Sequence, residues 1–190
     1  MKRQKLVSYE TASPGTQAIY DEAKRTLQID YVPNWMQALG NNENILRATW
    51  EKFKYVVLEG EVPQLLKQLI LFMISIKANN EYCTAVHGYS ALNLDPTLTY
   101  DDLMSMARGE SYGNLPVTFQ VALDLVTQAA LSSKDVADED FDFEEQLLDE
   151  GFSEQEIDEL MAQADFGMMM NVIIDIYDIP VDVPFGPDVS

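Results

Sequence analysis

The sequence predicts an all-α protein, a bundle of about eight helices, and three observations lead to this fold class. Apolar residues recur at helical spacing, with little sign of the two-residue alternation of strands. Capping residues and prolines mark the starts of successive segments. Hydrophobic residues make up 47% of the 190 residues, enough to bury the core of a single domain over residues 1–190.

Helix starts in the first half of the chain are marked by capping residues and prolines. Ser13 followed by Pro14 is a capping residue with proline at the first helical position, Asn42 is a second N-cap, and Pro63 precedes a long apolar run. The break at residues 31–34 separates the first helix from a short second one. The predicted helices of this half cover residues 14–27, 35–39, 42–59 and 64–78.

The second half continues the helical pattern. Thr99 with Asp102, and Ser153 with Glu156, have the spacing of N-terminal caps. We expect a solvated loop at residues 132–140 and an extended arm at residues 179–190, which contain three prolines. The predicted helices of this half cover residues 81–92, 99–109 and 116–131, then a short acidic helix ending at residue 151 and a long last helix from residue 153.

The charge is concentrated at one end of the chain. The net charge is −20; residues 1–134 contain 14 acidic and 12 basic residues, whereas residues 135–190 contain 18 acidic residues and neither Lys nor Arg. Such a surface repels phosphates and anionic lipids, so we expect neither a nucleic acid nor a membrane as partner. The acidic region favours solubility, or it is a docking face for a basic partner.

Cysteine and histidine usage limits the possible sites. One cysteine excludes an intrachain disulfide and a cysteine-based zinc site, and one histidine without a carboxylate cluster argues against a catalytic metal. We therefore expect no metal and no other cofactor. The basic start lacks the apolar run of a secretory signal, and no apolar stretch is long enough to span a membrane. These features predict a soluble, cytoplasmic protein.

The only cysteine and the only histidine lie one helical turn apart, as Cys83 and His87. Positions i and i+4 share one face of a helix, so a thiol and an imidazole are expected to lie near each other. Cys83 also falls in the first turn of its predicted helix, a setting that stabilises a thiolate. We therefore expect a lowered thiol pKa. The alternative is structural, because a free cysteine often behaves as a small buried hydrophobe.

Four segments of the chain resemble one family. Residues 79–87, Asn-Asn-Glu-Tyr-Cys-Thr-Ala-Val-His, resemble the N-G-C-x-Y-C-x-x-x-H core of the alkyl hydroperoxidase D and carboxymuconolactone decarboxylase superfamily. Residues 65–78 resemble the helix that leads into this core. Residues 31–39 (YVPNWMQAL) and 151–157 (GFSEQEI) are similar to Y-V-P-N-F-F-R-A-L and G-F-S-D-A-E-I of its peroxidase-related branch. The resemblance covers about residues 10–182.

The resemblance implies a site that this chain keeps only in part. Active members use a Cys-x-x-Cys pair, a histidine four residues later and a glutamate twelve residues before the first cysteine. Cys83 matches the peroxide-attacking cysteine and His87 the histidine. Asn80 stands at the resolving cysteine and Gln68 at the glutamate. Asn80 can cap the helix by binding a backbone N–H near Cys83. A dithiol cycle within one chain is impossible, so an external thiol would have to reduce an oxidised Cys83.

Three functions stay open from the sequence. The first is a thiol-dependent, peroxidase-like oxidoreductase that acts on a peroxide or another small molecule, with Cys83 as nucleophile and His87 as base. The second is non-redox acid–base catalysis of the carboxymuconolactone decarboxylase type, led by His87. The third is a non-catalytic helical scaffold or interaction protein with a degenerate site. The resemblance also implies a homo-oligomer, a trimer or hexamer, and the apolar last helix, with Met168–Met170, favours self-association.

Overall fold

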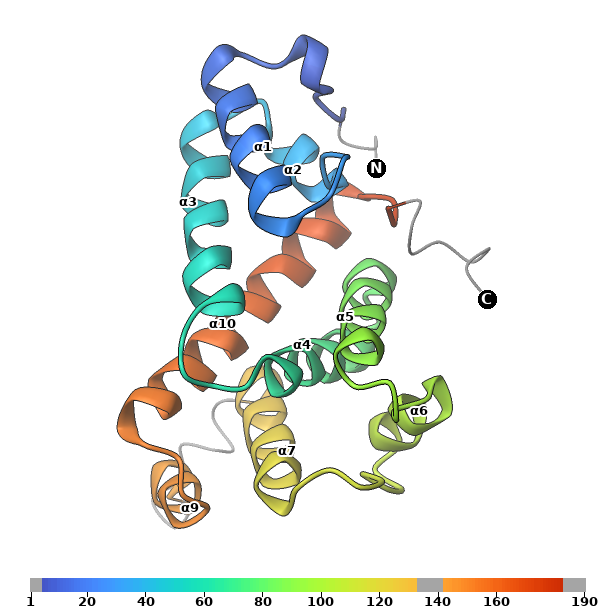
Figure 1. Ribbon diagram of the computed structural model, residues 1–190, viewed down its shortest axis with the longest axis vertical. Coiled ribbons are helices and arrows are strands. Elements are labelled where there is room, and N and C mark those ends of the chain that lie inside the picture. The colour runs from blue at the N-terminus through green and yellow to red at the C-terminus, as the bar shows by residue number, and fades with distance from the viewer. Residues whose placement is uncertain (1–4, 133–141, 183–190) are drawn as a thin grey trace.

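The computed structural model describes residues 5–132 and 142–182, and the regular secondary structure of these two ranges is all helical (Figure 1). They contain no strand, and eight of their α-helices have seven residues or more, which confirms the predicted fold class. The α-helices are α1 (Pro14–Leu27), α2 (Asn34–Leu39), α3 (Glu43–Phe53), α4 (Gln64–Lys77), α5 (Glu81–Leu94), α6 (Tyr100–Ala107), α7 (Val117–Leu131), α9 (Phe143–Asp149) and α10 (Glu154–Tyr177).

Local capping accounts for most of the helix starts. Ser13 accepts a hydrogen bond from the amide of Thr16, and Asn42 accepts one from the amide of Ile45. Thr99 and Ser153 each form a complete capping box with the acidic residue three positions later. These caps confirm the predicted starts of four helices, because each depends only on neighbouring residues.

The third predicted helix differs from expectation. The α-helix ends at Phe53 and the chain continues as one π-helical stretch, η2 (Lys54–Leu58). A short 3₁₀ turn, η1 (Tyr9–Thr11), also precedes α1. Within the π-helix, the carbonyl oxygen of Val56 accepts hydrogen bonds from α4 and α10, described below. Residues 133–140 of the expected loop and the arm beyond residue 182 lie outside the described residues.

Two apolar clusters meet at α4. One contains side chains of α4, α6, α7, α9 and the first half of α10. The other contains α1, α2, α3, η2 and the second half of α10, together with Cys83. Gly167 lets α10 approach closely, since a Cβ there would lie 3.1 Å from Leu71 of α4. Figure 1 shows α10 running from α9 to the group formed by α1 and α2.

The helix α4 is the most enclosed element. Ten of its fourteen residues are buried, including the polar side chains of Lys67 and Gln68. Each of these needs a polar partner, because an unpaired buried polar group is destabilising. Within the described ranges, no helix combines the length and the apolar character needed to cross a bilayer.

Candidate active site

The start of α5 is held by Asn80. Asn79 adopts the left-handed conformation (φ 58°), which reverses the chain after α4. The side-chain oxygen of Asn80 then accepts a hydrogen bond from the amide of Cys83 at 2.8 Å. This confirms the predicted cap, and it places Cys83 in the first turn of the helix.

Asn80 also joins α5 to α10. Its side-chain nitrogen donates to a carboxylate oxygen of Asp175 at 2.7 Å and to the carbonyl oxygen of Asn171 at 3.3 Å. At the position that resembles a resolving cysteine, this chain therefore has a residue that fixes the helix bearing the remaining cysteine.

The environment of Cys83 corrects the expected thiol acidity. The side chain is 3% exposed, and this burial raises the pKa of the thiol to about 12. The carboxylate of Asp175 acts in the same direction. The hydroxyl of Ser75, buried without a regular hydrogen-bond partner, lies near enough to the sulfur to oppose the shift. Removal of the sulfur from water outweighs the favourable field of the helix N-terminus, so the thiol is protonated at neutral pH.

His87 is buried and neutral. Its Nδ1 atom is 2.8 Å from the side-chain oxygen of Gln68, and burial lowers the pKa of the imidazole to about 4. Because an amide oxygen only accepts hydrogen bonds, Nδ1 carries the proton and Nε2 keeps its lone pair. Within the described residues, this bond to Gln68 is the hydrogen bond of His87, and none joins it to Cys83. Cys83 and His87 are therefore related by lining the same cavity and not by a direct hydrogen bond.

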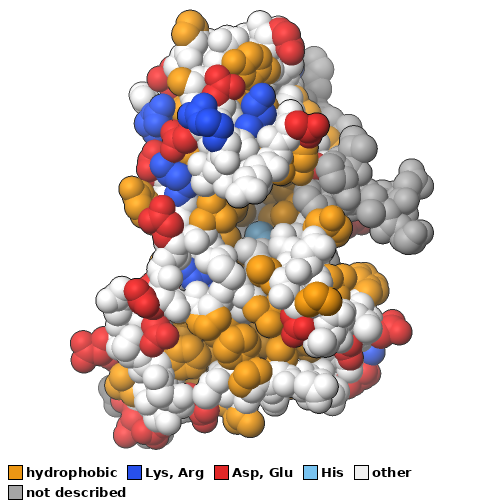
Figure 2. Space-filling view, in the orientation of Figure 1, with side chains coloured by type: hydrophobic (Ala, Val, Ile, Leu, Met, Phe, Trp, Pro, Cys, Tyr) orange, Lys and Arg blue, Asp and Glu red, His pale blue; other side chains and the backbone are white. Residues whose placement is uncertain are grey.

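That cavity has a volume of about 230 Å³ and is mostly apolar. Figure 2 shows a hollow in the face of the molecule, with orange side chains around it and the pale blue of the chain's only histidine at its base. Cys83, His87 and Gln68 all line it. The other lining residues are Leu27, Ile29, Tyr31, Pro33, Trp35, Phe53, Val57, Leu58, Tyr82, Val86, Ser90, Phe166, Met170 and Asp182.

Asp182 is the lining residue that sequence analysis missed most clearly. It is 4% exposed, and its carboxylate accepts hydrogen bonds from the Tyr82 hydroxyl at 2.5 Å and the Asn34 amide at 2.8 Å. The described start of the predicted arm, residues 179–182, thus folds back onto α2 and α5 and brings Asp182 to the cavity. Tyr31 could have been identified from the sequence, because it lies in the Tyr-Val-Pro-Asn segment that resembles the family. No spacing in the sequence relates Asp182 to Tyr82.

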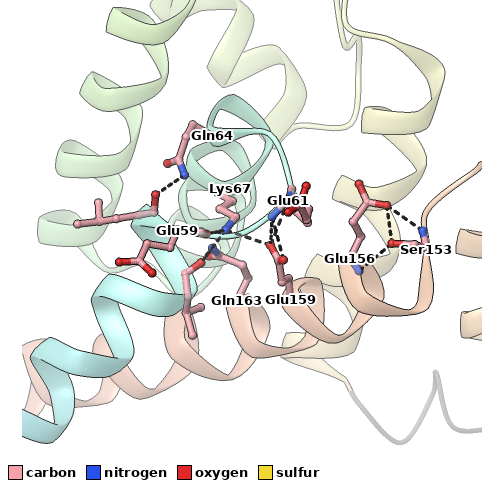
Figure 3. Close-up of polar contacts among 11 residues, drawn as sticks. Glu59, Glu61, Gln64, Lys67, Ser153, Glu156, Glu159 and Gln163 are labelled. Carbon is pink, nitrogen blue, oxygen red and sulfur yellow. Dashed lines mark hydrogen bonds and ion pairs between the residues drawn. The ribbon is translucent and has the colours of Figure 1, made fainter.

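A buried ion pair fixes the wall opposite α5 (Figure 3). Lys67 Nζ lies 3.2 Å from a carboxylate oxygen of Glu159 and donates to the carbonyl oxygens of Val56 (3.1 Å) and Glu59. Gln163 of α10 also donates to the Val56 carbonyl, at 2.6 Å. These carbonyls belong to η2 and its C-cap, so the network stabilises the π-helix that contributes Val57 and Leu58 to the cavity.

The same carboxylate organises the following turn. Both oxygens of Glu159 accept from the amide of Glu61 (2.9 and 3.0 Å), and one also accepts from the amide of Val62 (3.1 Å). Gly60 has φ +102°, and a Cβ there would lie 2.2 Å from the carboxylate. The turn between η2 and α4 is thus built around a carboxylate of α10. In the described ranges, no group of three or more histidine, cysteine or acidic side chains is arranged to hold a metal ion.

Comparison with known proteins gives a fold match. No protein-family model and no curated protein sequence matches the chain. Among solved structures, the alkylhydroperoxidase AhpD core of an uncharacterized peroxidase-related protein from Ralstonia eutropha JMP134 has a TM-score of 0.80 at 18% identity, over 96% of this chain and 93% of its own. An uncharacterized peroxidase-related protein from Silicibacter sp. TM1040 has a TM-score of 0.78 at 20% identity, over 97% and 95%.

A third similar structure has a different activity in its name. The debrominase Bmp8, as a variant in complex with 2,3,4-tribromopyrrole, has a TM-score of 0.76 at 17% identity, over 96% of this chain and 93% of its own. Three neighbours of similar length therefore share the whole arrangement of helices. The chain has the fold of the alkylhydroperoxidase AhpD core, as the sequence resemblance predicted.

Proposed function

We propose that the chain is a divergent member of the alkyl hydroperoxidase D superfamily and a thiol-dependent, peroxidase-like oxidoreductase. The observation that carries this proposal is the cavity that contains both the Cys83 thiol and the neutral imidazole of His87. Cys83 is the nucleophile, His87 is its base, and Gln68 holds the imidazole in one tautomer.

The first step oxidises the cysteine. The Cys83 sulfur attacks the outer oxygen of a hydroperoxide and the O–O bond breaks, which gives a sulfenic acid and an alcohol. His87 Nε2 takes the thiol proton, and the leaving alkoxide receives a proton in return. An external thiol then condenses with the sulfenic acid and releases water. A second external thiol reduces the mixed disulfide and restores Cys83.

Burial gives this mechanism a specific character. Since burial raises the pKa of the thiol to about 12 and lowers that of His87 to about 4, the stable pair at neutral pH is thiol and imidazole. Proton transfer must therefore accompany the attack on the substrate. Such a site reacts slowly with small polar reagents and gains its rate from a substrate that fills the apolar cavity.

The test is trapping of the sulfenic acid. Purified protein is treated with cumene hydroperoxide and a dione trap, and Cys83 is followed by mass spectrometry beside the rate of peroxide loss. We expect about one equivalent of peroxide consumed without added thiol, and turnover with it. His87→Gln should lower the rate by about 10²- to 10⁴-fold, and Cys83→Ser should abolish it. Equal peroxide consumption by the intact chain and by Cys83→Ser would contradict the proposal.

A second function is supported by the debrominase among the structural neighbours, which was solved with a brominated pyrrole. In a reductive dehalogenation, a carbon–halogen bond is replaced by a carbon–hydrogen bond while two thiols become a disulfide and hydrogen halide is released. The aromatic lining of the cavity suits such a substrate. Release of bromide from 2,3,4-tribromopyrrole in the presence of an external thiol, lost in Cys83→Ser, would select this function over the first.

A further inference from the structure

Among the described residues, the wall of the cavity contains one acidic side chain, that of Asp182. Of the seventeen lining residues within the described ranges, the others are neither acidic nor Lys or Arg. Among residues 5–132 and 142–182, no Lys or Arg forms an ion pair with Asp182. Its carboxylate instead accepts two hydrogen bonds, from the Tyr82 hydroxyl and the Asn34 amide. Burial raises the pKa of Asp182, and these two hydrogen bonds oppose that shift by stabilising the carboxylate. Within the described ranges its negative charge is thus stabilised by dipoles and not neutralised by a cation.

The carboxylate has capacity for a further donor. A carboxylate offers about four acceptor positions, and the two protein donors use one oxygen each. Burial raises the pKa of the Tyr31 hydroxyl to about 12, and the nearby charge of Asp182 adds to this shift. A ligand in the cavity therefore meets a region of negative potential where the arm crosses it, surrounded by apolar and aromatic side chains.

The polar side chains of His87 and Gln68, which also line the cavity, do not balance this charge. His87 is neutral because burial lowers its pKa to about 4, and Gln68 is neutral at all pH values. An anionic ligand would lose its hydration, would find no cation, and would be repelled by Asp182. A ligand with a hydroxyl or N–H group would satisfy the carboxylate, and its apolar body would be buried against the aromatic walls.

We propose that Asp182 makes the cavity selective for compact uncharged molecules with an apolar body and a hydroxyl or N–H donor at one end, and that it excludes carboxylates. This inference rests on the proposed function, because it names the substrate class of the same site. Asp182 binds and orients the substrate, and the covalent chemistry stays with Cys83.

Three probes with the same methylphenyl body test the selectivity. 4-Methylphenol offers a hydroxyl donor, 4-methylanisole has no donor, and 4-methylbenzoate is an anion. Dissociation constants are measured by NMR titration of the methyl signal of Met170, which lines the cavity. We expect 4-methylphenol to bind at least tenfold more tightly than either other probe, a difference of about 1.4 kcal/mol.

Two variants separate the charge from the fold of the arm. Asp182→Asn keeps the shape, so we expect 4-methylphenol to lose its advantage and 4-methylbenzoate to bind more tightly. Tyr82→Phe removes a hydrogen bond of the arm but keeps the carboxylate, so the order of the probes should stay. Asp158→Asn, at an exposed position of α10, should change nothing. If Asp182 had a purely structural role, Tyr82→Phe and Asp182→Asn would change the dissociation constants of the three probes in the same way. That result would overturn the proposal.

The outcomes are distinct from those of the redox test. None of the probes is a peroxide, and the same order is expected in Cys83→Ser. If Cys83 proves inert while 4-methylphenol keeps its advantage, the redox function is wrong and the selectivity stands. If Cys83 is oxidised but 4-methylbenzoate binds as tightly as 4-methylphenol, the role of Asp182 is wrong and the redox function stands. Failure of all three probes to bind also overturns the selectivity.

Discussion

Asn80 binds the backbone amide of Cys83 through its side-chain oxygen at 2.8 Å, and through its side-chain nitrogen it holds Asp175 at 2.7 Å. One amide side chain thus fixes both the first turn of α5 and the carboxylate that opposes ionisation of the thiol. The reactivity of Cys83 is coupled by this contact to the position of α10.

This coupling predicts how the thiol responds to Asp175→Asn. The carboxylate raises the pKa of Cys83, so removing its charge should lower that pKa. Alkylation of Cys83 at a fixed pH should then be faster, because more thiolate is present. The measurement is the rate of iodoacetamide modification against pH. In the intact chain the midpoint should lie well above the ordinary value of about 8.5; a midpoint below it would contradict the structural account.

Gln68→Glu should change the charge state of His87. A carboxylate in place of the amide oxygen, 2.8 Å from Nδ1, would favour the imidazolium. The pKa of His87 should rise from about 4 to the ordinary value of about 6.5 or beyond. Because the chain has one histidine, its ring signals in an NMR titration are unambiguous. Gln155→Glu adds the same charge at an exposed position of α10 and should leave the titration unchanged.

His87 also makes folding sensitive to acid. The unfolded chain protonates its histidine near pH 6.5, whereas the folded chain keeps it neutral down to about pH 4. The unfolded state therefore binds more protons between these values, and stability falls as the pH is lowered through this window. The loss is about 3 kcal/mol by pH 4. Urea unfolding of the chain and of His87→Gln at pH 7.5 and 4.5 should show this difference; parallel curves would refute it.

Lys67→Met should be strongly destabilising. It leaves the carboxylate of Glu159 without its cation and the carbonyl oxygen of Glu59 without its Lys67 donor. Breaking a buried ion pair from one side costs about 3–5 kcal/mol. Because the Glu159 side chain is 15% exposed and keeps the amides of Glu61 and Val62 as donors, we expect a loss at the lower end of this range. Lys52→Met is the matched control, since Lys52 pairs with the exposed Asp165, and exposed pairs contribute about 0–1 kcal/mol. Similar unfolding free energies for the two variants would show that the Lys67 network is dispensable.

Self-association is the last prediction. The resemblance implies a trimer or hexamer, and α10 leaves Val172 and Ile176 more than half exposed, at 58% and 52%. If this face is the interface, Val172→Glu with Ile176→Glu should dissociate the oligomer in light scattering. Val117→Glu changes an exposed position on α7 and should leave the oligomer intact. A monomer at micromolar concentration in low and moderate salt would mean that the apolar face of α10 serves another purpose.

Local signals explain what the sequence predicted well. The caps at Ser13, Asn42, Asn80 and Ser153 each join residues three positions apart, so a short segment determines them. The prediction of a lowered thiol pKa was wrong because the burial of Cys83 depends on α1–α3 and α10 together. No short segment of the sequence specifies that packing.

The remaining surprises have the same origin. The π-helix forms where Lys67 and Gln163, from two other helices, both donate to the carbonyl oxygen of Val56. Asp182 reaches the cavity only because the arm folds back onto α2, one hundred residues beyond Tyr82. Both features depend on which helices are neighbours, and spacing along the chain does not contain that information.

The π-helical stretch has a consequence for how this cavity can diverge. A π turn holds one residue more than an α turn, so deleting a single residue within Lys54–Leu58 would restore α-helical geometry. The turn would then be closed by one residue fewer, so the side chains that follow the deletion would shift along the helix relative to Phe53. Phe53, Val57 and Leu58 would then present a different surface to a bound molecule. A one-residue length change in this wall is therefore a short evolutionary route to a new substrate, with Cys83 and His87 untouched on the opposite wall.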